Sequence, residues 1–213
     1  MNASNKQALL GVGTNYKTIK SKKVGVLTGI LYMAPYTLSG KNVCPNASAG
    51  CAAACLNTAG RGAMKSVKRA RLKKTNRFWD DRGQFLQDLA EEVGKLQRRA
   101  EAIGMLAAVR LNGTSDLPYE RYKVPGTDKN IMELFPAVQF YDYTKLENRF
   151  IGKKLPANYH LTFSRAEDND HKLAAVLEYT SASVVFSGKL PATWRGYPVI
   201  DGDEHDARFT DAG

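Results

Sequence analysis

Three cysteines are the residues of this chain best placed to do chemistry together. They are Cys44, Cys51 and Cys55, and the 213-residue chain contains no other cysteine. Their spacing, Cys-x6-Cys-x3-Cys, brings three soft ligands onto one short segment, as a metal ion or an iron–sulfur cluster requires. Cys51 and Cys55 are four residues apart and would face the same side of a helical turn. We therefore expect the three thiolates to bind one inorganic centre.

The residues between the cysteines suit such a centre. Gly50 permits a sharp bend of the backbone just before the second ligand. The small side chains of residues 52–54 leave room for a bulky inorganic core and favour a helix. Pro45 fixes the chain as it leaves the first ligand, as in the Cys-Pro step of bacterial ferredoxins.

Other uses of three cysteines stay open. One disulfide with a free thiol, or three buried apolar fillers, would also account for them. An odd number of cysteines argues against a secreted disulfide framework, and a structural zinc would need a fourth ligand from an aspartate or a distant histidine. The histidines available are His160, His171 and His205. We favour a [4Fe-4S] cluster, in which three cysteines leave one iron open to water, substrate, cofactor or a non-cysteine ligand.

Length and charge limit the class of protein. The chain is long enough for a real core, and we expect a single domain over residues 1–213. No apolar run approaches the roughly 20 residues that span a membrane. Residues 1–7 are polar and lack the apolar stretch of an export signal, which favours a reducing, cytoplasmic compartment. The net charge of +10 indicates a polyanionic partner at some stage.

The first half of the chain must position the cysteines. We expect a peripheral basic segment over residues 1–23, strand structure over residues 24–36 leading to the cysteine loop, and a short helix over residues 51–60. Apolar residues recur at helical spacing over residues 63–103, with a break expected at residues 80–83.

The start of that helical stretch is strongly basic. Its basic residues are Lys65, Lys68, Arg69, Arg71, Lys73 and Lys74. Such a run is either an ordinary solvated helix face or a surface that follows the phosphates of a nucleic acid, and the sequence favours neither.

Beyond residue 104 the pattern changes to short strands alternating with short helices. Strands are expected at residues 105–111, 137–141, 159–163, 183–186 and 197–200, and helices at residues 131–135, 145–150 and 170–179. This alternation predicts an α/β domain with a largely parallel sheet. Polar residues follow almost every strand, and the cysteine loop follows the first strand region, so all would meet at the carboxyl edge of the sheet.

Several motifs together resemble the phage gene product 88 family. The resemblance spans about residues 40–210 and rests on four stretches. These are the Cys-Pro…Gly-Cys…Cys-Leu run, the helix with Arg71, Lys74, Thr75, Phe78 and Asp81, the strand at residues 109–116, and residues 201–209. The resemblance implies a phage origin and a host-cytoplasmic setting, and it implies little about activity.

A more distant likeness is to radical S-adenosylmethionine enzymes. A three-cysteine loop after the first strand of a parallel-sheet partial (βα) barrel is similar to their arrangement. The likeness implies that S-adenosylmethionine is a possible cofactor on the open iron. Four residues would then line the cluster side of the pocket, namely Arg110, Asn112, Ser115 and Asp116.

Three classes of function follow from these observations. The first is a redox or radical enzyme whose cluster meets a substrate or cofactor at the rim. The second is an electron-transfer or sensing protein, in which a protein ligand such as Asp116, Asp203 or His205 closes the open position. The third is a nucleic-acid-binding phage protein with a structural metal site.

Overall fold

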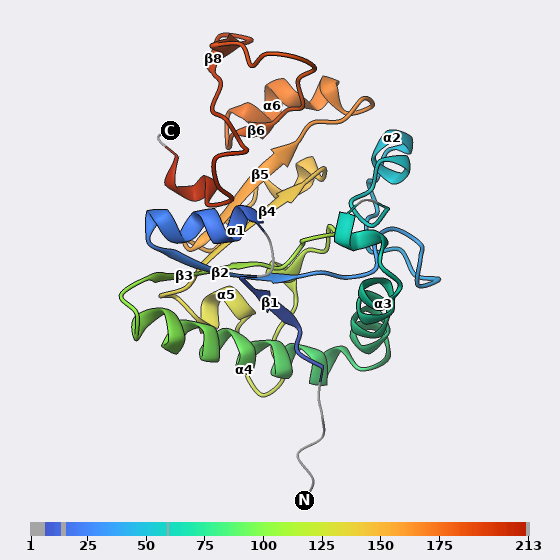
Figure 1. Ribbon diagram of the computed structural model, residues 1–213, viewed down its shortest axis with the longest axis vertical. Helices are drawn as coiled ribbons and strands as arrows, with labels where there is room; N and C mark the ends of the chain where they lie inside the picture. Colours follow the sequence, from blue (N-terminus) through green and yellow to red (C-terminus); the bar gives the residue numbers. More distant parts are fainter. Residues whose placement is uncertain (1–6, 14–15, 59, 212–213) are drawn as a thin grey trace, which may run out of the picture.

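A six-stranded sheet organises the protein (Figure 1). The computed structural model describes residues 7–13, 16–58 and 60–211. The strands lie side by side in chain order: β1 (Leu10–Val12), β2 (Val26–Leu31), β3 (Leu106–Arg110), β4 (Gln139–Thr144), β5 (Tyr159–Ser164) and β6 (Ala182–Ser183). Strands β2 to β6 are parallel, and β1 is antiparallel to β2. Within the described ranges no pairing joins β1 to β6, so the sheet is open and does not close into a barrel.

Helices connect the parallel strands. The α-helices are α1 (Tyr16–Ser21), α2 (Ala49–Ala53), α3 (Lys65–Asp80), α4 (Arg82–Glu101), α5 (Ile131–Leu134) and α6 (Leu173–Leu177). Short 3-10 turns are η1 (Lys22–Val24), η2 (Gly60–Ala63), η3 (Tyr119–Arg121), η4 (Glu147–Arg149), η5 (Asp170–Lys172) and η6 (Arg208–Thr210). The mixed α/β architecture and the largely parallel sheet confirm the class predicted from the alternation of elements.

The long helical stretch breaks where it was expected to. Asp81 leaves helical geometry with φ −146° and ψ 80°, and its side chain accepts a hydrogen bond from the Gln84 N–H, so it caps α4. The apolar stripe is buried on both sides of the break, with Phe78 on α3 and Phe85 and Leu89 on α4. Two helices therefore fold from one periodic pattern.

The two faces of the sheet are covered differently. Leu27, Val109 and Phe140 belong to the main core, and α4 runs across that face (Figure 1). On the opposite face, Ala108 and Tyr141 belong to a small cluster with residues of the C-terminal segment. Side chains alternate between the faces because successive residues of a strand point in opposite directions.

Three predicted boundaries differ from the structure. The described part of residues 1–23, which we expected to be peripheral, contributes β1 to the sheet edge, and Leu9 beside it is fully buried. Residues 142–144, expected to follow a strand, lie inside β4. The expected last strand of the sheet is instead β8 (Tyr197–Pro198), which pairs with β7 (Thr193–Trp194) in a separate hairpin. Arg195 and Gly196 both have positive φ there, as a tight hairpin turn requires.

Candidate functional site

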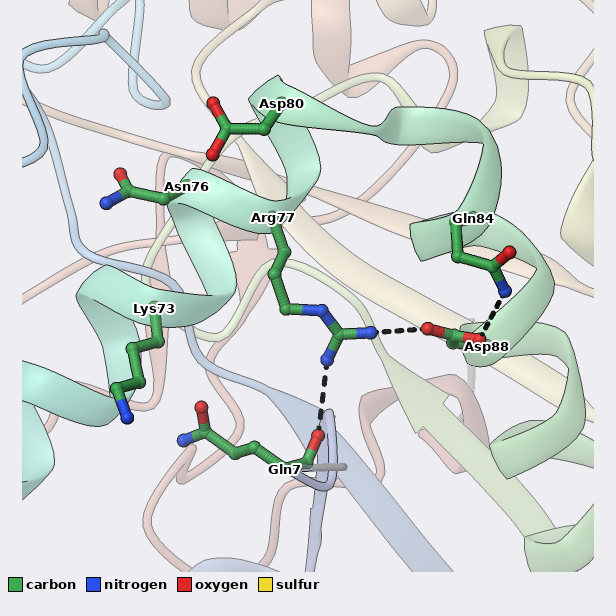
Figure 2. Close-up of a pocket in the computed structure, with 7 residues that line it drawn as sticks. All are labelled: Gln7, Lys73, Asn76, Arg77, Asp80, Gln84 and Asp88. Carbon is green, nitrogen blue, oxygen red and sulfur yellow. Dashed lines mark hydrogen bonds and ion pairs between the residues drawn. The ribbon is translucent and has the colours of Figure 1, made fainter. Parts of the chain in front are cut away.

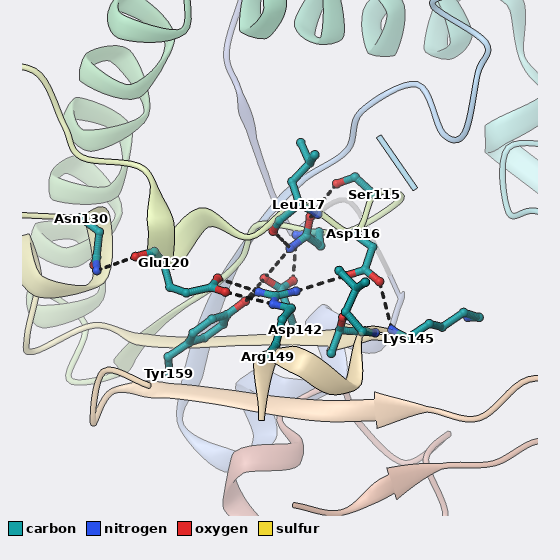
Figure 3. Close-up of polar contacts among 12 residues, drawn as sticks. Ser115, Asp116, Leu117, Glu120, Asn130, Asp142, Lys145, Arg149 and Tyr159 are labelled. Carbon is teal, nitrogen blue, oxygen red and sulfur yellow. Dashed lines mark hydrogen bonds and ion pairs between the residues drawn. The ribbon is translucent and has the colours of Figure 1, made fainter. Parts of the chain in front are cut away.

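A buried ionic network lies where β3 and β4 end (Figure 3). Its centre is Arg149, whose side chain is fully buried. The guanidinium donates to Asp116 Oδ1 at 3.0 Å, to Glu120 Oε2 at 2.7 Å and to the Tyr159 hydroxyl at 2.8 Å. Both carboxylates raise the pKa of Arg149 against the effect of burial. The charge of this arginine is therefore compensated by groups that the chain itself supplies.

Asp142 is the third acid of this network and joins it through Tyr159. It accepts hydrogen bonds from the Asn112 N–H at 2.7 Å, from Asn112 Nδ2 at 3.1 Å and from the Tyr159 hydroxyl at 3.1 Å. Burial raises the pKa of Asp142 to about 6, although Arg110, the Asn112 N–H and Arg149 act in the opposite direction. This carboxyl group is buried and surrounded by donors, so it holds the end of β3 against β4.

Sequence reasoning missed the arginine that unites these acids. Arg149 lies in a short polar turn that reads as solvent-exposed, and nothing in its neighbourhood marks it as buried. Asp116 and Glu120 lie about 30 residues before it in the chain, so only the fold brings them together. The polar residues at the ends of strands were the available signal, and they indicated this edge correctly.

The residues predicted to bind a cofactor fall into two groups. Arg110 donates to Asp206 at 3.3 Å and stacks on Tyr143, so its direct contacts differ from those of the other three residues. Asn112, Ser115 and Asp116 are neighbours in one loop: Ser115 donates to Asn112 Oδ1 at 2.8 Å, and Asp116 Oδ2 accepts from the Lys145 N–H at 3.0 Å. The side chains of these three loop residues already have partners within the chain, whereas the buried Nε of Arg110 has none among the described residues. Binding of a cofactor by the four residues stays a prediction.

The first cysteine is attached to the same loop. Cys44 Sγ accepts a hydrogen bond from the Tyr36 N–H at 3.3 Å and lies 3.6 Å from the Thr114 carbonyl oxygen. One residue earlier, the Val43 carbonyl accepts from the Asp116 N–H at 2.8 Å. The chain that follows β2 is therefore held directly against the chain that follows β3.

The second and third cysteines lie at α2. Ser48 caps this short helix by accepting from the Cys51 N–H at 3.1 Å. Glu167, in the loop after β5, accepts from the Gly50 N–H at 2.7 Å. The Cys51 residue is exposed, Cys55 is half-buried, and neither forms a disulfide. Residues 44–55 thus contact loops that follow both β3 and β5.

Cys51 and Cys55 lie close enough to Cys44 to affect its thiol. The pKa of Cys44 is raised to about 11, first by burial and then by the nearby Asp116, Cys55 and Cys51, while the Tyr36 N–H acts against this rise. A group of three or more histidine, cysteine, aspartate or glutamate side chains arranged to hold a metal ion is not found among the residues that the structure describes. The sulfur atoms therefore do not converge as a ready ligand set.

A buried arginine lies beside the third cysteine. Arg71 is 8% exposed, and its Nη1 donates to Asn57 Oδ1 at 2.9 Å. Its guanidinium stacks on the ring of Tyr32 at 5.2 Å, and its Nε is buried with no hydrogen-bond partner in the described part of the chain. Burial lowers the pKa of Arg71, whereas Tyr32 and Cys55 act to raise it.

The six basic residues predicted as a phosphate-binding face do not share one face. Lys65, Arg69 and Lys73 are exposed and Lys68 is half-buried, but Arg71 is buried and Lys74 is directed inward. Lys74 Nζ donates to the Leu9 carbonyl at 2.6 Å, and burial lowers its pKa to about 8. Lys65, Arg69 and Lys73 therefore form an exposed stripe along α3, with one residue at every fourth position.

A hollow between α3 and α4 is lined by polar side chains (Figure 2). Arg77 donates to Asp88 and, at 3.3 Å, to the Gln7 carbonyl, while Gln84 Nε2 donates to Asp88 Oδ1 at 2.8 Å. Those contacts join β1 to the helix pair. The hollow contains none of the cysteines, so it has no part in the predicted centre.

Comparison with known proteins identifies the family. The fold and the edge described above define a mixed α/β protein with an open, mostly parallel sheet. A family model described as gene product 88 matches residues 6–213, and the chain belongs to this phage protein family. Neither curated proteins nor solved structures gave a match. In the described part of the chain, no helix is both long and apolar enough to cross a membrane.

Proposed function

We propose that Cys44, Cys51 and Cys55 bind one metal–sulfur centre at the carboxyl edge of the sheet. The occupant we favour is a [4Fe-4S] cluster with an open or non-cysteine fourth position, in a partial-barrel-like setting that serves redox or radical chemistry. The observation that carries the proposal is that all three cysteines are free thiols on one segment, which contacts the loops after β3 and β5, and that the buried Arg71 binds Asn57 just beyond the third cysteine. Free thiols suit a reducing compartment such as the host cytoplasm.

The donor set fits a soft centre in chemistry and charge. Thiolates are the ligands that iron–sulfur clusters and zinc prefer. Three thiolates on a [4Fe-4S]²⁺ core leave one net negative charge, which the guanidinium of Arg71 would offset. Assembly requires the segment from Cys44 to Cys55 to close further, and the hydrogen bonds that Ser48 and Glu167 make to it are those that would have to adjust.

The cluster supplies electron transfer when it is bound, and the chain's own groups set its surroundings. Cys44 is half-buried against the main core, so that ligand is shielded from water, whereas Cys51 is exposed. A centre of this kind has one side in protein and one side open. An open side suits a substrate or cofactor such as S-adenosylmethionine, and a fourth protein ligand would favour an electron-transfer or sensing protein instead.

Anaerobic purification with iron and sulfide analysis tests the proposal. We expect brown protein with about four irons per chain and a visible iron–sulfur absorption band. Cys44→Ser, Cys51→Ser and Cys55→Ser should each lose iron, whereas Ala54→Ser, in the same segment, should retain it. Colourless protein that binds one zinc contradicts the cluster, and retention of metal in all three cysteine variants contradicts the site.

Adding S-adenosylmethionine to the reconstituted protein tests the radical version. A changed electron spin resonance signal of the reduced cluster supports cofactor binding at the open iron. An unchanged signal leaves electron transfer or sensing as the role of the cluster.

The exposed stripe on α3 favours a second candidate function, binding of a nucleic acid. Lys65, Arg69 and Lys73 recur every four residues and are exposed, so they lie on one side of the helix. A helix face of this kind can follow a phosphate backbone, and binding should then weaken steeply as salt rises.

Fluorescence anisotropy with labelled DNA over a salt series tests this candidate. Changing the three stripe residues together to glutamine should lower the slope of log K against log salt by about 2–3. Changing Lys95, Arg98 and Arg99 on α4, which are all exposed, to glutamine is the matched control. No binding at moderate salt, or equal slopes for the two triple variants, contradicts this function.

A further inference from the structure

Arg71 carries a buried charge for which the described chain provides no carboxylate. Its partners are the amide oxygen of Asn57, the ring of Tyr32 and the nearby Cys55. Among the residues that the structure describes, the Nε atom has no hydrogen-bond acceptor. A charge held away from water is expensive unless an opposite charge or a full set of hydrogen bonds compensates it. The missing group is therefore an anion.

The sequence around Arg71 also contains no acidic residue that could serve as its counter-charge. Residues 1–79 contain 14 lysines and arginines and not one aspartate or glutamate, so the first acid of the chain is Asp80. Burial, and to a smaller extent the nearby Arg71, lower the pKa of Lys74 to about 8, so this neighbour of Arg71 is a second cation and not an anion. Within this acid-free stretch, thiols and tyrosine hydroxyls are the only side chains that can become negative. Arg71 is held against the cysteine segment by its 2.9 Å hydrogen bond to Asn57, two residues after Cys55, so Cys55 is the thiol of this stretch nearest to that contact along the chain.

We propose that Arg71 is the counter-cation of the thiolate centre, and that it selects a centre of one net negative charge. The inference rests on the proposed function and deepens it. A divalent metal with three thiolates and a neutral fourth ligand has this charge, as does an oxidised [4Fe-4S] cluster with three thiolates. A fourth thiolate or a carboxylate ligand would add a second negative charge. Among the described residues the other buried arginine, Arg149, already pairs with Asp116 and Glu120, so no second buried guanidinium is left to offset that charge and the fourth ligand is neutral.

Asn57 offers a direct way to supply the missing anion from within the chain. Its Oδ1 is 2.9 Å from Arg71 Nη1, so Asn57→Asp places a carboxylate on the guanidinium with almost no change of shape. If Arg71 lacks an anion, this variant stabilises the metal-free protein. The same internal pair then competes with the thiolates for Arg71 and weakens metal binding.

The experiment is a Co²⁺ titration of the metal-free full-length protein without oxygen, followed by the thiolate-to-cobalt absorption band. Arg71→Gln should bind Co²⁺ about tenfold or more weakly, because a charge-assisted partner of the centre is lost. Arg71→Lys, which keeps the charge, should fall between that variant and wild type. Arg99→Gln removes an exposed charge from α4 and should bind as wild type does. Circular dichroism melts report whether each variant is folded.

The outcomes separate the two proposals. Equal Co²⁺ affinity of wild type and folded Arg71→Gln overturns the role of Arg71 and leaves the metal centre standing. A wild-type protein without the cobalt band contradicts the centre itself. The melting temperature of metal-free Asn57→Asp gives a test that needs no metal. A value above that of metal-free wild type supports a missing anion at Arg71, and an equal or lower value overturns it.

Discussion

Arg149 and Arg71 are both buried, and the protein treats them in opposite ways. Arg149 has two carboxylates and a tyrosine hydroxyl within 3.1 Å, and its pKa is raised. Arg71 has one neutral amide oxygen and an aromatic ring, and its pKa is lowered. The fold supplies two carboxylates to Arg149, whereas the described chain supplies Arg71 with a neutral amide oxygen and no carboxylate.

This difference separates structure from function at one edge of the sheet. The network around Arg149 ties the loops after β3 and β4 together and leaves its polar groups satisfied. Such saturation is what a structural element needs, because an unpaired buried charge destabilises the fold. An unsatisfied cation bound to the chain just beyond Cys55 has no comparable structural use. The contrast is the physical reason to look for ligands near Arg71 and not near Arg149.

Removing Arg149 should give the largest effect on stability. Arg149→Gln leaves Asp116 and Glu120 largely buried without their cation, so the free energy of unfolding should fall by about 3–5 kcal/mol. Urea unfolding measures the loss, and Lys154→Gln, an exposed change in the nearby loop, is the control. A loss below about 1 kcal/mol would mean that the network does not hold this edge together.

The pH dependence of stability should report on Asp142. Its folded pKa, raised to about 6, lies above the ordinary value of 3.8, so its contribution to stability is complete below about pH 4. That contribution is lost as the pH rises through 6, and it amounts to about 3 kcal/mol. Asp142→Asn should flatten the dependence between pH 4 and 6, at a constant cost of about 1 kcal/mol for a lost acceptor.

Urea unfolding of wild type and Asp142→Asn at several pH values measures this effect. Asp80→Asn, at the exposed end of α3, is the control and should keep the wild-type slope. The same slope for Asp142→Asn and wild type would show that the buried carboxyl group stays ionised without penalty.

The sequence predicts the local features of the fold, but it does not predict the contacts between charged residues that are distant in the chain. Periodicity located α3, α4 and the break at Asp81, because apolar spacing and a capping aspartate are local signals. The alternation of strands and helices indicated the parallel sheet and the edge where polar loops gather. The partners of Arg149 come from about 30 residues away in the chain, and no local pattern encodes such a pairing.

The burial of Arg71 could not be predicted from the sequence either, and the reason is again physical. Arg71 reads as one member of a basic helix face, and only its burial separates it from Arg69 and Lys73. Its position on the helix faces the loop that returns from β2, whose course is set by contacts such as that between Cys44 and Thr114. The sequence predicts a cation near the cysteines, but it does not predict that Arg71 lacks a carboxylate partner.

Replacing Arg71 in the metal-free protein should have a small effect. Arg71→Gln removes an uncompensated charge together with one hydrogen bond, so the two contributions oppose each other and the net change should stay within about 1 kcal/mol. Urea unfolding with a chelator present measures it against Arg149→Gln. If the free energy of unfolding fell as much as it does in Arg149→Gln, Arg71 would already have a strong partner, and the contrast between the two arginines would be contradicted.

The smallest effect is expected at the hydrogen bond that joins α2 to the loop after β5. Glu167 is exposed and accepts from the Gly50 N–H, so Glu167→Ala should leave global unfolding unchanged. It should free the start of α2 and increase the rate at which Cys55 reacts with a thiol reagent. Glu178→Ala, exposed just after α6, is the control. Faster labelling confined to Cys51 and Cys55, with Cys44 unaffected, would show that α2 opens while the side of the edge around Arg149 stays closed.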